Sequence, residues 1–396
     1  MKLLDEQGVT YPRGFRAAAV HCGIRKRALD LALIVSETPA SGAGVFTRNR
    51  CCAAPVIVSR RHLAGGVPRA ILVNSGNANA ATGAAGVRAA EECVKATAQR
   101  LGCPPAEVLV ASTGIIGVPL PAGKIISALD GLVRGLSPAH GAAAAQAIMT
   151  TDTFPKQRAL SVKLRGGTVR LGGIAKGAGM IMPNMATMLS FITCDARIGA
   201  TRWQRLLRRA VNASFNRISI DGDTSTNDCV LALANGAAGV PVCADEEPRF
   251  FAALQALCME LAHLIVRDGE GATKFVTITV EGCARTRHAD LIARTVANSP
   301  LVKTALTGCN PNWGRVIAAA GRAGVVFDPE RLDVYFNGVL TVKNGCAAGA
   351  AKDVLDALFK QKEITIRIVL REGRAHATVW TTDLSHEYVA INVAYS

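Results

Sequence analysis

The sequence lacks long apolar runs, and aromatic residues make up only 5% of its 396 positions. A helix that spans a membrane needs about 20 mostly apolar residues, so we expect no membrane span. The opening stretch, MKLLDEQGVTYPRGF, becomes charged and contains glycine and proline before the apolar core of a signal peptide can form. We therefore expect a cytoplasmic protein with no membrane partner.

Metal-ligating cysteine patterns are also missing. The 12 cysteines are spread along the chain, and no CxxC pair or paired Cys/His spacing occurs. Cys51 and Cys52 are neighbours in the sequence and cannot easily bridge each other. The cysteines therefore indicate neither a structural zinc site nor a disulfide scaffold, and they favour a reducing compartment.

Acidic residues are in the minority, with 30 Asp and Glu against 45 Lys and Arg and a net charge of +15. Such a surplus attracts anions, and nucleic acid is the first anion to consider. The densest basic stretch, RWQRLLRR (202–209), places its arginines at helical spacing opposite Leu206, Leu207 and Val211, which indicates a solvated helix face. Because no RNA- or DNA-binding motif accompanies it, we expect a small acidic substrate, with a basic RNA-binding protein as the weaker alternative.

The chain contains strands and helices in mixed succession, which is typical of an α/β or α+β layered sandwich. Apolar runs and turn residues predict early strands in FRAAAVHCGI, LDLALIVSE, AGVFTRN and APVIVS, all within residues 15–60. Further strands are predicted in AILVNSGN, EVLVAS, RALSVKL, TVRLGGIAK, MLSFITCDA, RISI and KFVTITVEGC, and helices at 87–101, 122–149 with a break at Ser137–Pro138, 201–214 and 248–269.

The loop RISIDGDTSTND (217–228) supports a second kind of enzyme. A strand that ends in Asp221-x-Asp223 resembles the nucleophile loop of haloacid-dehalogenase-type phosphatases, in which the first carboxylate attacks phosphorus and the second is the acid/base. The same letters resemble a calcium loop, but Thr226 occupies the glycine position and no glutamate follows at the last ligand position. A structural loop, in which Asp and Asn side chains bind backbone donors, is the favoured interpretation.

Thr113 and Gly114 form a turn directly after a predicted strand, in STGIIG (112–117). A threonine hydroxyl and a backbone N–H that point at one position are what an oxyanion hole requires. Turns of this kind are common after strands, so the pattern alone favours an ordinary turn.

Thr187 lies in KGAGMIMPNMATMLSFITCDA (176–196), between an irregular glycine- and proline-containing segment and a predicted strand. Cleavage between Ala186 and Thr187 would free an α-amine that can act as the base for the threonine hydroxyl, which would then form an acyl ester. Residue type and spacing alone still favour a buried threonine in a strand.

Separated segments together resemble the ornithine acetyltransferase family, also called glutamate N-acetyltransferases, of arginine biosynthesis. The resemblance runs in order along nearly the whole chain and rests on these stretches: GFRAAAVHCGI, DLALIVSETPASGAGVFTRN, NSGNANAATG, ASTGIIG, MTTDTFPK, GIAKGAGMIMPNMATMLSFITCDA, DGDTSTND, RDGEGATKF, NPNWGR and YVAINVAYS.

The resemblance implies a role for individual residues. Thr187 would first cut the chain, through an N-to-O acyl shift of the Ala186 carbonyl, and then carry the acetyl group, while Thr113 and Gly114 would form the oxyanion hole. The implied substrate contacts are Thr150 (with Thr151 as the neighbouring alternative), Lys176, Thr187, Glu270, Asn392 and Ser396. A lysine suits an α-carboxylate and Glu270 suits an ammonium group.

The implied reaction is a ping-pong transfer of acetyl from N-acetyl-ornithine to glutamate, without a metal or redox cofactor. Acetyl-CoA is a further donor in bifunctional members. The implied fold is an αββα sandwich similar to but distinct from the N-terminal-nucleophile hydrolases, with a catalytic core at 1–275 and a smaller C-terminal α/β domain at 276–396. Cleavage would give an α chain (1–186) and a β chain (187–396) in an α2β2 heterotetramer.

Two departures from the family pattern and one relative limit this interpretation. Cys309–Asn310 precede PNWGR where the family commonly has an aspartate, and Ser396 ends the chain where other members often have threonine. Autoprocessed aminopeptidases of the same architecture transfer their acyl group to water, but they use a serine nucleophile where this chain has Thr187.

Overall fold

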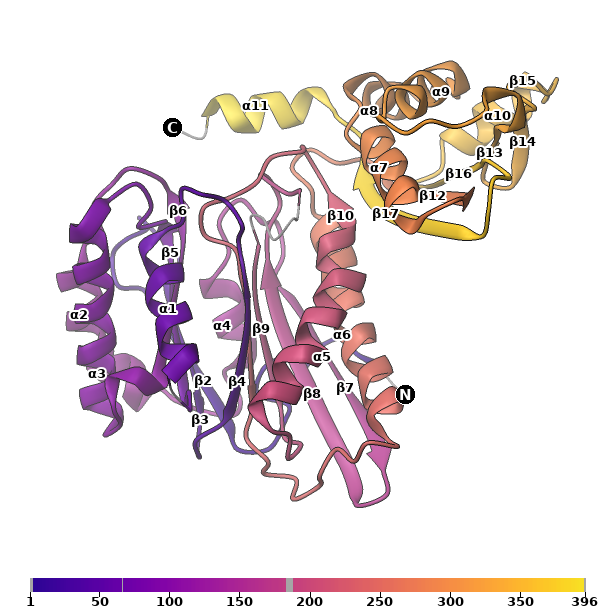
Figure 1. The fold of residues 1–396 in the computed structure, drawn as a ribbon. Helices are drawn as coiled ribbons and strands as arrows, with labels where there is room; N and C mark the ends of the chain where they lie inside the picture. Colours follow the sequence, from indigo (N-terminus) through magenta and orange to yellow (C-terminus); the bar gives the residue numbers. More distant parts are fainter. Residues whose placement is uncertain (1–2, 66, 183–187, 395–396) are drawn as a thin grey trace. The chain divides into compact units, whose positions relative to one another are not determined.

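The computed structural model describes residues 3–65, 67–182 and 188–394 (Figure 1). The chain divides into two compact units. Unit 1 comprises Met1–Asn216 and Asp223–Ile265, and unit 2 comprises Arg217–Gly222 and Val266–Ser396. The domain division at 275/276, which rests on the family resemblance, stays a prediction.

Unit 1 contains two β-sheets. The four-stranded sheet has the order β2-β3-β5-β6, antiparallel except for the parallel pair β5–β6, and the six-stranded sheet has the order β1-β7-β8-β9-β11-β4. The strands are β1 (Leu3–Leu4), β2 (Phe15–Val20), β3 (Leu31–Ser36), β4 (Ser41–Phe46), β5 (Ala70–Asn77), β6 (Val108–Ile115), β7 (Lys156–Leu164), β8 (Gly167–Lys176), β9 (Leu189–Cys194) and β11 (Cys229–Ala234).

The main core of unit 1 lies between the two sheets. Buried Ile34 and Ile71 of the four-stranded sheet belong to one apolar cluster with Phe191 and Leu231 of the six-stranded sheet. A short alanine-rich helix, α4 (Gly141–Ala147), adds small side chains to the same cluster. Two sheets that bury their facing sides against each other are the inner layers of a sandwich.

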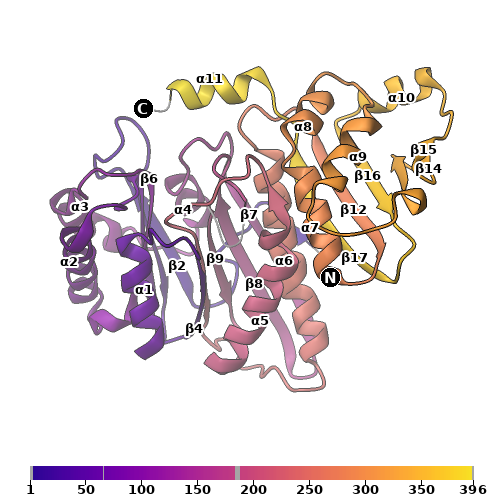
Figure 2. The same cartoon turned by 45° about the horizontal axis from the view of Figure 1, so that its top comes forward.

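Helices cover the outer sides of both sheets (Figures 1 and 2). The helices α1 (Ala54–Gly65), α2 (Gly83–Leu101) and α3 (Ala122–Arg134) lie against the four-stranded sheet, and a second apolar cluster fills that layer. On the other sheet, α5 (Ala200–Ala213) binds β4 through paired hydrogen bonds between Gln204 and the Gly44 backbone, both 2.9 Å long. The layered α/β sandwich predicted from the sequence is confirmed.

The strand predicted in APVIVS is wrong, because these residues begin α1. Valine-rich runs favour strands only as long as packing agrees. Here Val56 and Val58 are buried in helical geometry, and the Ser59 hydroxyl both accepts from the amide of Val110 and donates to its carbonyl, at 2.7 and 2.6 Å. The predicted strand RISI is also shorter than expected, since only Ile218–Ser219 form β10.

The remaining predicted elements of unit 1 are confirmed, and their ends follow ordinary capping chemistry. The helix α2 ends at Gly102, which adopts a left-handed conformation (φ 63°) that only glycine enters at little cost. The helical region 122–149 divides into α3 and α4 around Ser137, as predicted. Short 3-10 turns lie at Pro105–Glu107 and Phe215–Arg217.

The basic stretch 202–209 forms the solvated face of α5. Trp203, Leu206 and Leu207 are buried, while the guanidinium of Arg205 lies 2.6 Å from the Glu247 carboxylate. Arg202 and Arg209 also lie within 4 Å of Glu247. The arginines therefore form a network with one carboxylate at the surface, as the helical spacing predicts.

One helix in the described part of the chain, α6 (Glu247–Arg267), is long and apolar enough to cross a membrane by length and composition alone. Half of its most apolar stretch is buried within the protein. Leu257 and Leu261 lie on the Gly173 backbone of β8, where a side chain in place of Gly173 would clash with Leu261 at 2.8 Å. These contacts are those of a core helix.

Unit 2 is a seven-stranded sheet covered by helices, in the order β10-β17-β12-β16-β13-β14-β15. Its strands after β10 are β12 (Phe275–Cys283), β13 (Asp333–Phe336), β14 (Val339–Lys343), β15 (Cys346–Ala347), β16 (Glu363–Val369) and β17 (Ala375–Thr382). Its helices are α7 (Thr286–Ala297), α8 (Pro300–Thr307), α9 (Trp313–Gly321), α10 (Lys352–Phe359) and α11 (His386–Ala394), with a 3-10 turn at Pro329–Arg331. Ile278, Ile292 and Ile366 belong to one large apolar cluster in this unit.

Candidate active site

The ends of β6 and β8 bring three predicted residues of unit 1 together. The ammonium of Lys176, the last residue of β8, donates to the Thr150 hydroxyl at 2.6 Å and to the Thr113 hydroxyl at 3.3 Å. Lys176 and Thr113 are both buried, at 4% and 7% exposure. Because the Thr113 oxygen accepts from Lys176, its own hydrogen can be donated to a third atom.

Gly114 follows at a place where only glycine fits. Its φ of +133° lies outside the range of ordinary L residues. A Cβ atom on Gly114 would lie 2.3 Å from the carbonyl carbon of Gly76, which faces it on the parallel strand β5. The close approach of these two strand ends therefore requires glycine at position 114, next to Thr113.

The carboxylate of Asp152 is buried next to Lys176. Its Oδ1 accepts from the Lys156 ammonium at 2.5 Å and from the Gly177 amide at 2.7 Å, and its Oδ2 lies 4.0 Å from the Lys176 ammonium. Burial alone would raise the pKa of Asp152, but the two lysines and these hydrogen bonds lower it to about 2. Asp152 is therefore ionised at neutral pH.

A second buried carboxyl, Asp228, has the opposite character. Its Oδ1 accepts from the Met188 amide at 2.7 Å, while its Oδ2 is buried without a hydrogen-bond partner among the described residues. Burial raises the pKa of Asp228 well above its ordinary value, although the Met188 amide and the charge of Lys176 act in the other direction. The site thus combines one carboxyl group whose pKa is lowered with one whose pKa is raised.

The strand that follows the predicted nucleophile begins at this site. In the two ladders that flank β9, Leu189 pairs with Lys176 of β8 and with Cys229 of β11. Ala186 and Thr187 lie outside the described residues. The first described residue after them, Met188, is the one whose amide Asp228 holds.

The loop before β11 is tied to the same strand ends. The Asn227 side-chain amide donates to the carbonyls of Ala78 and Ser112, at 2.6 and 2.9 Å. The favoured structural interpretation of 217–228 expected side chains that bind backbone donors. Asp228 does so with the Met188 amide, whereas Asn227 supplies donors to carbonyls.

Two further predicted residues meet within unit 2. The Asn392 side chain on α11 donates to Glu270 Oε2 at 2.8 Å and to the Tyr388 carbonyl at 2.9 Å. The Tyr388 hydroxyl in turn donates to Asp221 at 3.3 Å. Ser396 lies outside the described residues.

A sequence model of the ArgJ family matches residues 16–396. The chain belongs to the ArgJ family. It is 49% identical over 390 residues to the arginine biosynthesis bifunctional protein ArgJ of Chlorobaculum tepidum, over 98% of this chain and 96% of that protein. It is 47% identical to the protein of the same name from Dehalococcoides mccartyi, over 100% of this chain and 98% of that one.

A solved structure agrees with this assignment. The crystal structure of the arginine biosynthesis bifunctional protein ArgJ from Bacillus halodurans is 38% identical, with a TM-score of 0.51. The match covers 53% of this chain and 100% of that one. The resemblance inferred from the sequence motifs is confirmed.

The phosphatase alternative is not favoured in an ArgJ family member. Its two aspartates belong to different compact units, Asp221 to unit 2 and Asp223 to unit 1. Among the residues that the structure describes, no group of three or more His, Cys, Asp or Glu side chains is arranged to hold a metal ion. All 12 cysteines are free thiols.

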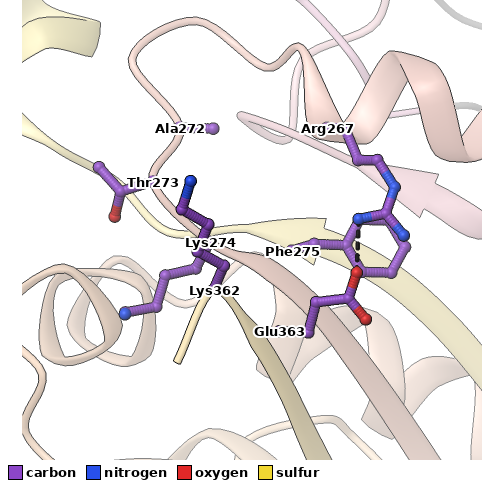
Figure 3. A pocket seen from close by; sticks show the side chains of 7 residues that line it. All are labelled: Arg267, Ala272, Thr273, Lys274, Phe275, Lys362 and Glu363. Carbon is purple, nitrogen blue, oxygen red and sulfur yellow. Dashed lines mark hydrogen bonds and ion pairs between the residues drawn. The ribbon is translucent and has the colours of Figure 1, made fainter. Parts of the chain in front are cut away.

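Unit 2 contains a pocket of about 490 Å³ that none of the predicted site residues lines. Figure 3 shows the side chains that do line it. Arg267 pairs with Glu363 at 2.6 Å and lies over the Phe275 ring, and the Lys274 ammonium donates to the Gln361 carbonyl at 3.0 Å. Because none of the predicted site residues lines this pocket, its volume does not identify it as the active site.

Sequence reasoning missed Asp152 and Asp228. Asp152 precedes Lys156 by four residues in MTTDTFPK, and Asp228 directly precedes a buried strand. A charged residue beside a buried strand is a weak signal by itself. Only the fold brings both carboxyl groups to Lys176.

Proposed function

We propose that this ArgJ family member is an acetyltransferase of arginine biosynthesis that moves acetyl from N-acetyl-ornithine to glutamate through an acetyl-Thr187 intermediate. The observation that carries the proposal is the family match over residues 16–396. The meeting of Thr113, Thr150 and Lys176 at the start of the strand that follows Thr187 supports it.

The proposed first half-reaction is an acyl transfer to oxygen. The free α-amine of Thr187 takes the proton of the Thr187 hydroxyl, whose oxygen attacks the acetyl carbonyl carbon of N-acetyl-ornithine. The oxyanion accepts hydrogen bonds from the Thr113 hydroxyl and the Gly114 amide. The C–N bond then breaks, the ornithine nitrogen takes the proton from the Thr187 amine, and the acetyl ester remains on Thr187.

The second half-reaction runs the same steps in reverse with another amine. The glutamate nitrogen attacks the ester carbonyl, the same two donors stabilise the oxyanion, and the Thr187 oxygen leaves with the proton that the nitrogen gives up. Because an amide is broken and an amide is formed, the exchange is nearly balanced in energy. In the same scheme acetyl-CoA is a second acetyl donor, with the thiol of CoA as the leaving group.

The proposed substrate contacts are of two kinds. The Lys176 ammonium and the Thr150 hydroxyl bind a substrate carboxylate. Glu270 binds an ammonium group, with Asn392 and Ser396 as further contacts. The substrates are small molecules, namely amino acids and their acetylated forms, and the reaction takes place in the cytoplasm.

The active enzyme forms by autoproteolysis. The Thr187 hydroxyl attacks the Ala186 carbonyl carbon, the peptide becomes an ester, and water hydrolyses this ester to leave an α chain (1–186) and a β chain (187–396). Two of each assemble into an α2β2 heterotetramer.

The function is tested by assaying wild type, Thr187→Ser and Thr187→Ala for acetyl transfer from N-acetyl-ornithine to glutamate. We expect wild type to be cleaved and active, Thr187→Ser to retain part of both properties, and Thr187→Ala to lose both. Release of acetate without acetylglutamate would support the aminopeptidase alternative, in which water is the acceptor. A magnesium-dependent phosphatase activity that Asp221→Asn abolishes would support the phosphatase.

A further inference from the structure

Asp152 binds the backbone of the two chain segments that contain Thr150 and Lys176, the predicted contacts of the substrate carboxylate. It lies in the turn between α4 and β7, and its side chain is fully buried. Its Oδ2 accepts from the Thr150 amide at 2.9 Å, while its Oδ1 accepts from the Gly177 amide at 2.7 Å. One carboxylate thus holds the backbone of Thr150 and the backbone next to Lys176.

We propose that Asp152 is a positioning residue for acetyl transfer, which holds the Lys176 ammonium and the Thr150 hydroxyl as one binding unit for the carboxylate of the amino-acid substrate. This proposal rests on the proposed function. Asp152 acts on the substrate indirectly, through the predicted substrate contacts Thr150 and Lys176.

The charges of the cluster fit an anionic ligand. The ammonium groups of Lys156 and Lys176 share the ionised carboxylate of Asp152. These three side chains therefore carry one net positive charge in a buried place. A buried charge is unfavourable unless a counter-charge accompanies it, and the carboxylate of an amino acid would supply that counter-charge.

The geometry explains why Lys156 is present as well. Its ammonium is fully buried, 2.5 Å from Asp152 Oδ1 and 5.0 Å from the centre of the Phe154 ring. This short contact holds Oδ1, so that Oδ2 is directed to the Thr150 amide and to Lys176. A buried ion pair is often no more stabilising than apolar side chains of similar volume. We therefore assign Lys156 the role of orienting Asp152.

The test uses a double variant, Asp152→Asn/Lys156→Met, because removing Asp152 alone would leave two buried ammonium groups without their shared carboxylate. The double variant removes the Asp152 carboxylate together with the Lys156 ammonium that is paired with it, so the net charge of Asp152, Lys156 and Lys176 stays at one positive charge. We expect the dissociation constant for ornithine, measured by calorimetry, to rise about 10- to 100-fold, the range of a hydrogen bond to a charged group. KM for N-acetyl-ornithine should rise by a similar factor, with kcat changed less than about fivefold.

Two further variants separate positioning from general stability. Lys156→Met alone keeps the Asp152 carboxylate beside Lys176 but removes the contact that orients it, and we expect ornithine affinity to fall by less than in the double variant. Asp195→Asn is the matched control, because Asp195 is equally buried in unit 1 but accepts from the amides of Arg170 and Arg13 instead. It should lower thermal stability and leave ornithine affinity per folded molecule unchanged.

The outcomes are decisive in both directions. If the folded double variant binds ornithine as tightly as wild type, or if Asp195→Asn weakens binding equally, the positioning role is overturned. Wild type that binds no ornithine overturns it as well. Wild type that binds ornithine but transfers no acetyl would remove the proposed function, and the affinities of the variants would still decide the role of Asp152 in holding the carboxylate site.

Discussion

Replacing Thr113 by valine removes one proposed oxyanion donor with little change of shape. The Thr113 hydroxyl is buried and lies 3.3 Å from the Lys176 ammonium. Lys176 keeps its 2.6 Å hydrogen bond to Thr150 in the variant. The free energy of unfolding should therefore fall by only about 1 kcal/mol, the usual net contribution of one hydrogen bond. Loss of one oxyanion donor lowers kcat about 10²- to 10³-fold, or about 2.7–4 kcal/mol.

The difference between these two magnitudes makes the experiment informative. Steady-state transfer from N-acetyl-ornithine to glutamate gives kcat, and urea unfolding gives the stability of the same preparation. Thr113→Ser keeps the hydroxyl and should retain kcat within about tenfold of wild type. Ser112→Ala is the matched control, because the neighbouring Ser112 hydroxyl is also buried but donates to Asn74 at 2.6 Å.

We expect Ser112→Ala to lose stability and keep its rate, and Thr113→Val to keep most of its stability and lose its rate. If Thr113→Val transfers acetyl within about threefold of wild type, a range too small for a lost oxyanion donor, then Thr113 is not a donor to the oxyanion. Equal rate losses in Thr113→Val and Ser112→Ala would point to general distortion of β6.

Three further predictions concern stability. Gly114→Ala should lower the free energy of unfolding by about 3 kcal/mol through its clash with Gly76, while Gly123→Ala, which meets no atom within 4 Å, should cost nothing in the same urea titration. Burial lowers the pKa of Lys303 to about 7, although the charges of nearby aspartates act in the other direction. Between pH 7 and 10.5 the unfolded chain therefore binds more protons than the folded one, and the free energy of unfolding should rise with pH across this window. This rise should disappear in Lys303→Met. Because burial raises the pKa of Asp228, the contribution of this group to stability is present in acid and is lost as pH rises. Asp228→Asn keeps an acceptor for the Met188 amide, so its free energy of unfolding at neutral pH should equal that of wild type. A large loss of stability would show that Asp228 is ionised and paired.

The sequence predicts the layered fold and most elements of unit 1 because their apolar periodicity agrees with their packing. The exception, α1, has a valine-rich sequence that suits a strand, and only its contacts with β6 and the neighbouring helices favour a helix. A short window of sequence does not contain those partners.

The candidate site was predictable to the extent that family motifs carry it. Thr113, Thr150 and Lys176 come from three separate segments, and their hydrogen bonds confirm that these segments meet. Asp152 and Asp228 were not predicted, since the importance of each comes from burial and from distance to Lys176. The roles of all the site residues stay predictions, namely those of Thr113, Gly114, Thr150, Lys176, Ala186, Thr187, Glu270, Asn392 and Ser396.

The most direct test of the central claim is the mass of each polypeptide after wild-type protein is mixed with N-acetyl-ornithine and no acceptor. We predict two polypeptides, 1–186 and 187–396, with one acetyl group on Thr187 of the second, which disappears when glutamate is added and appears as acetylglutamate. An intact chain that still transfers acetyl, or an acetyl group on a residue other than Thr187, would contradict the account.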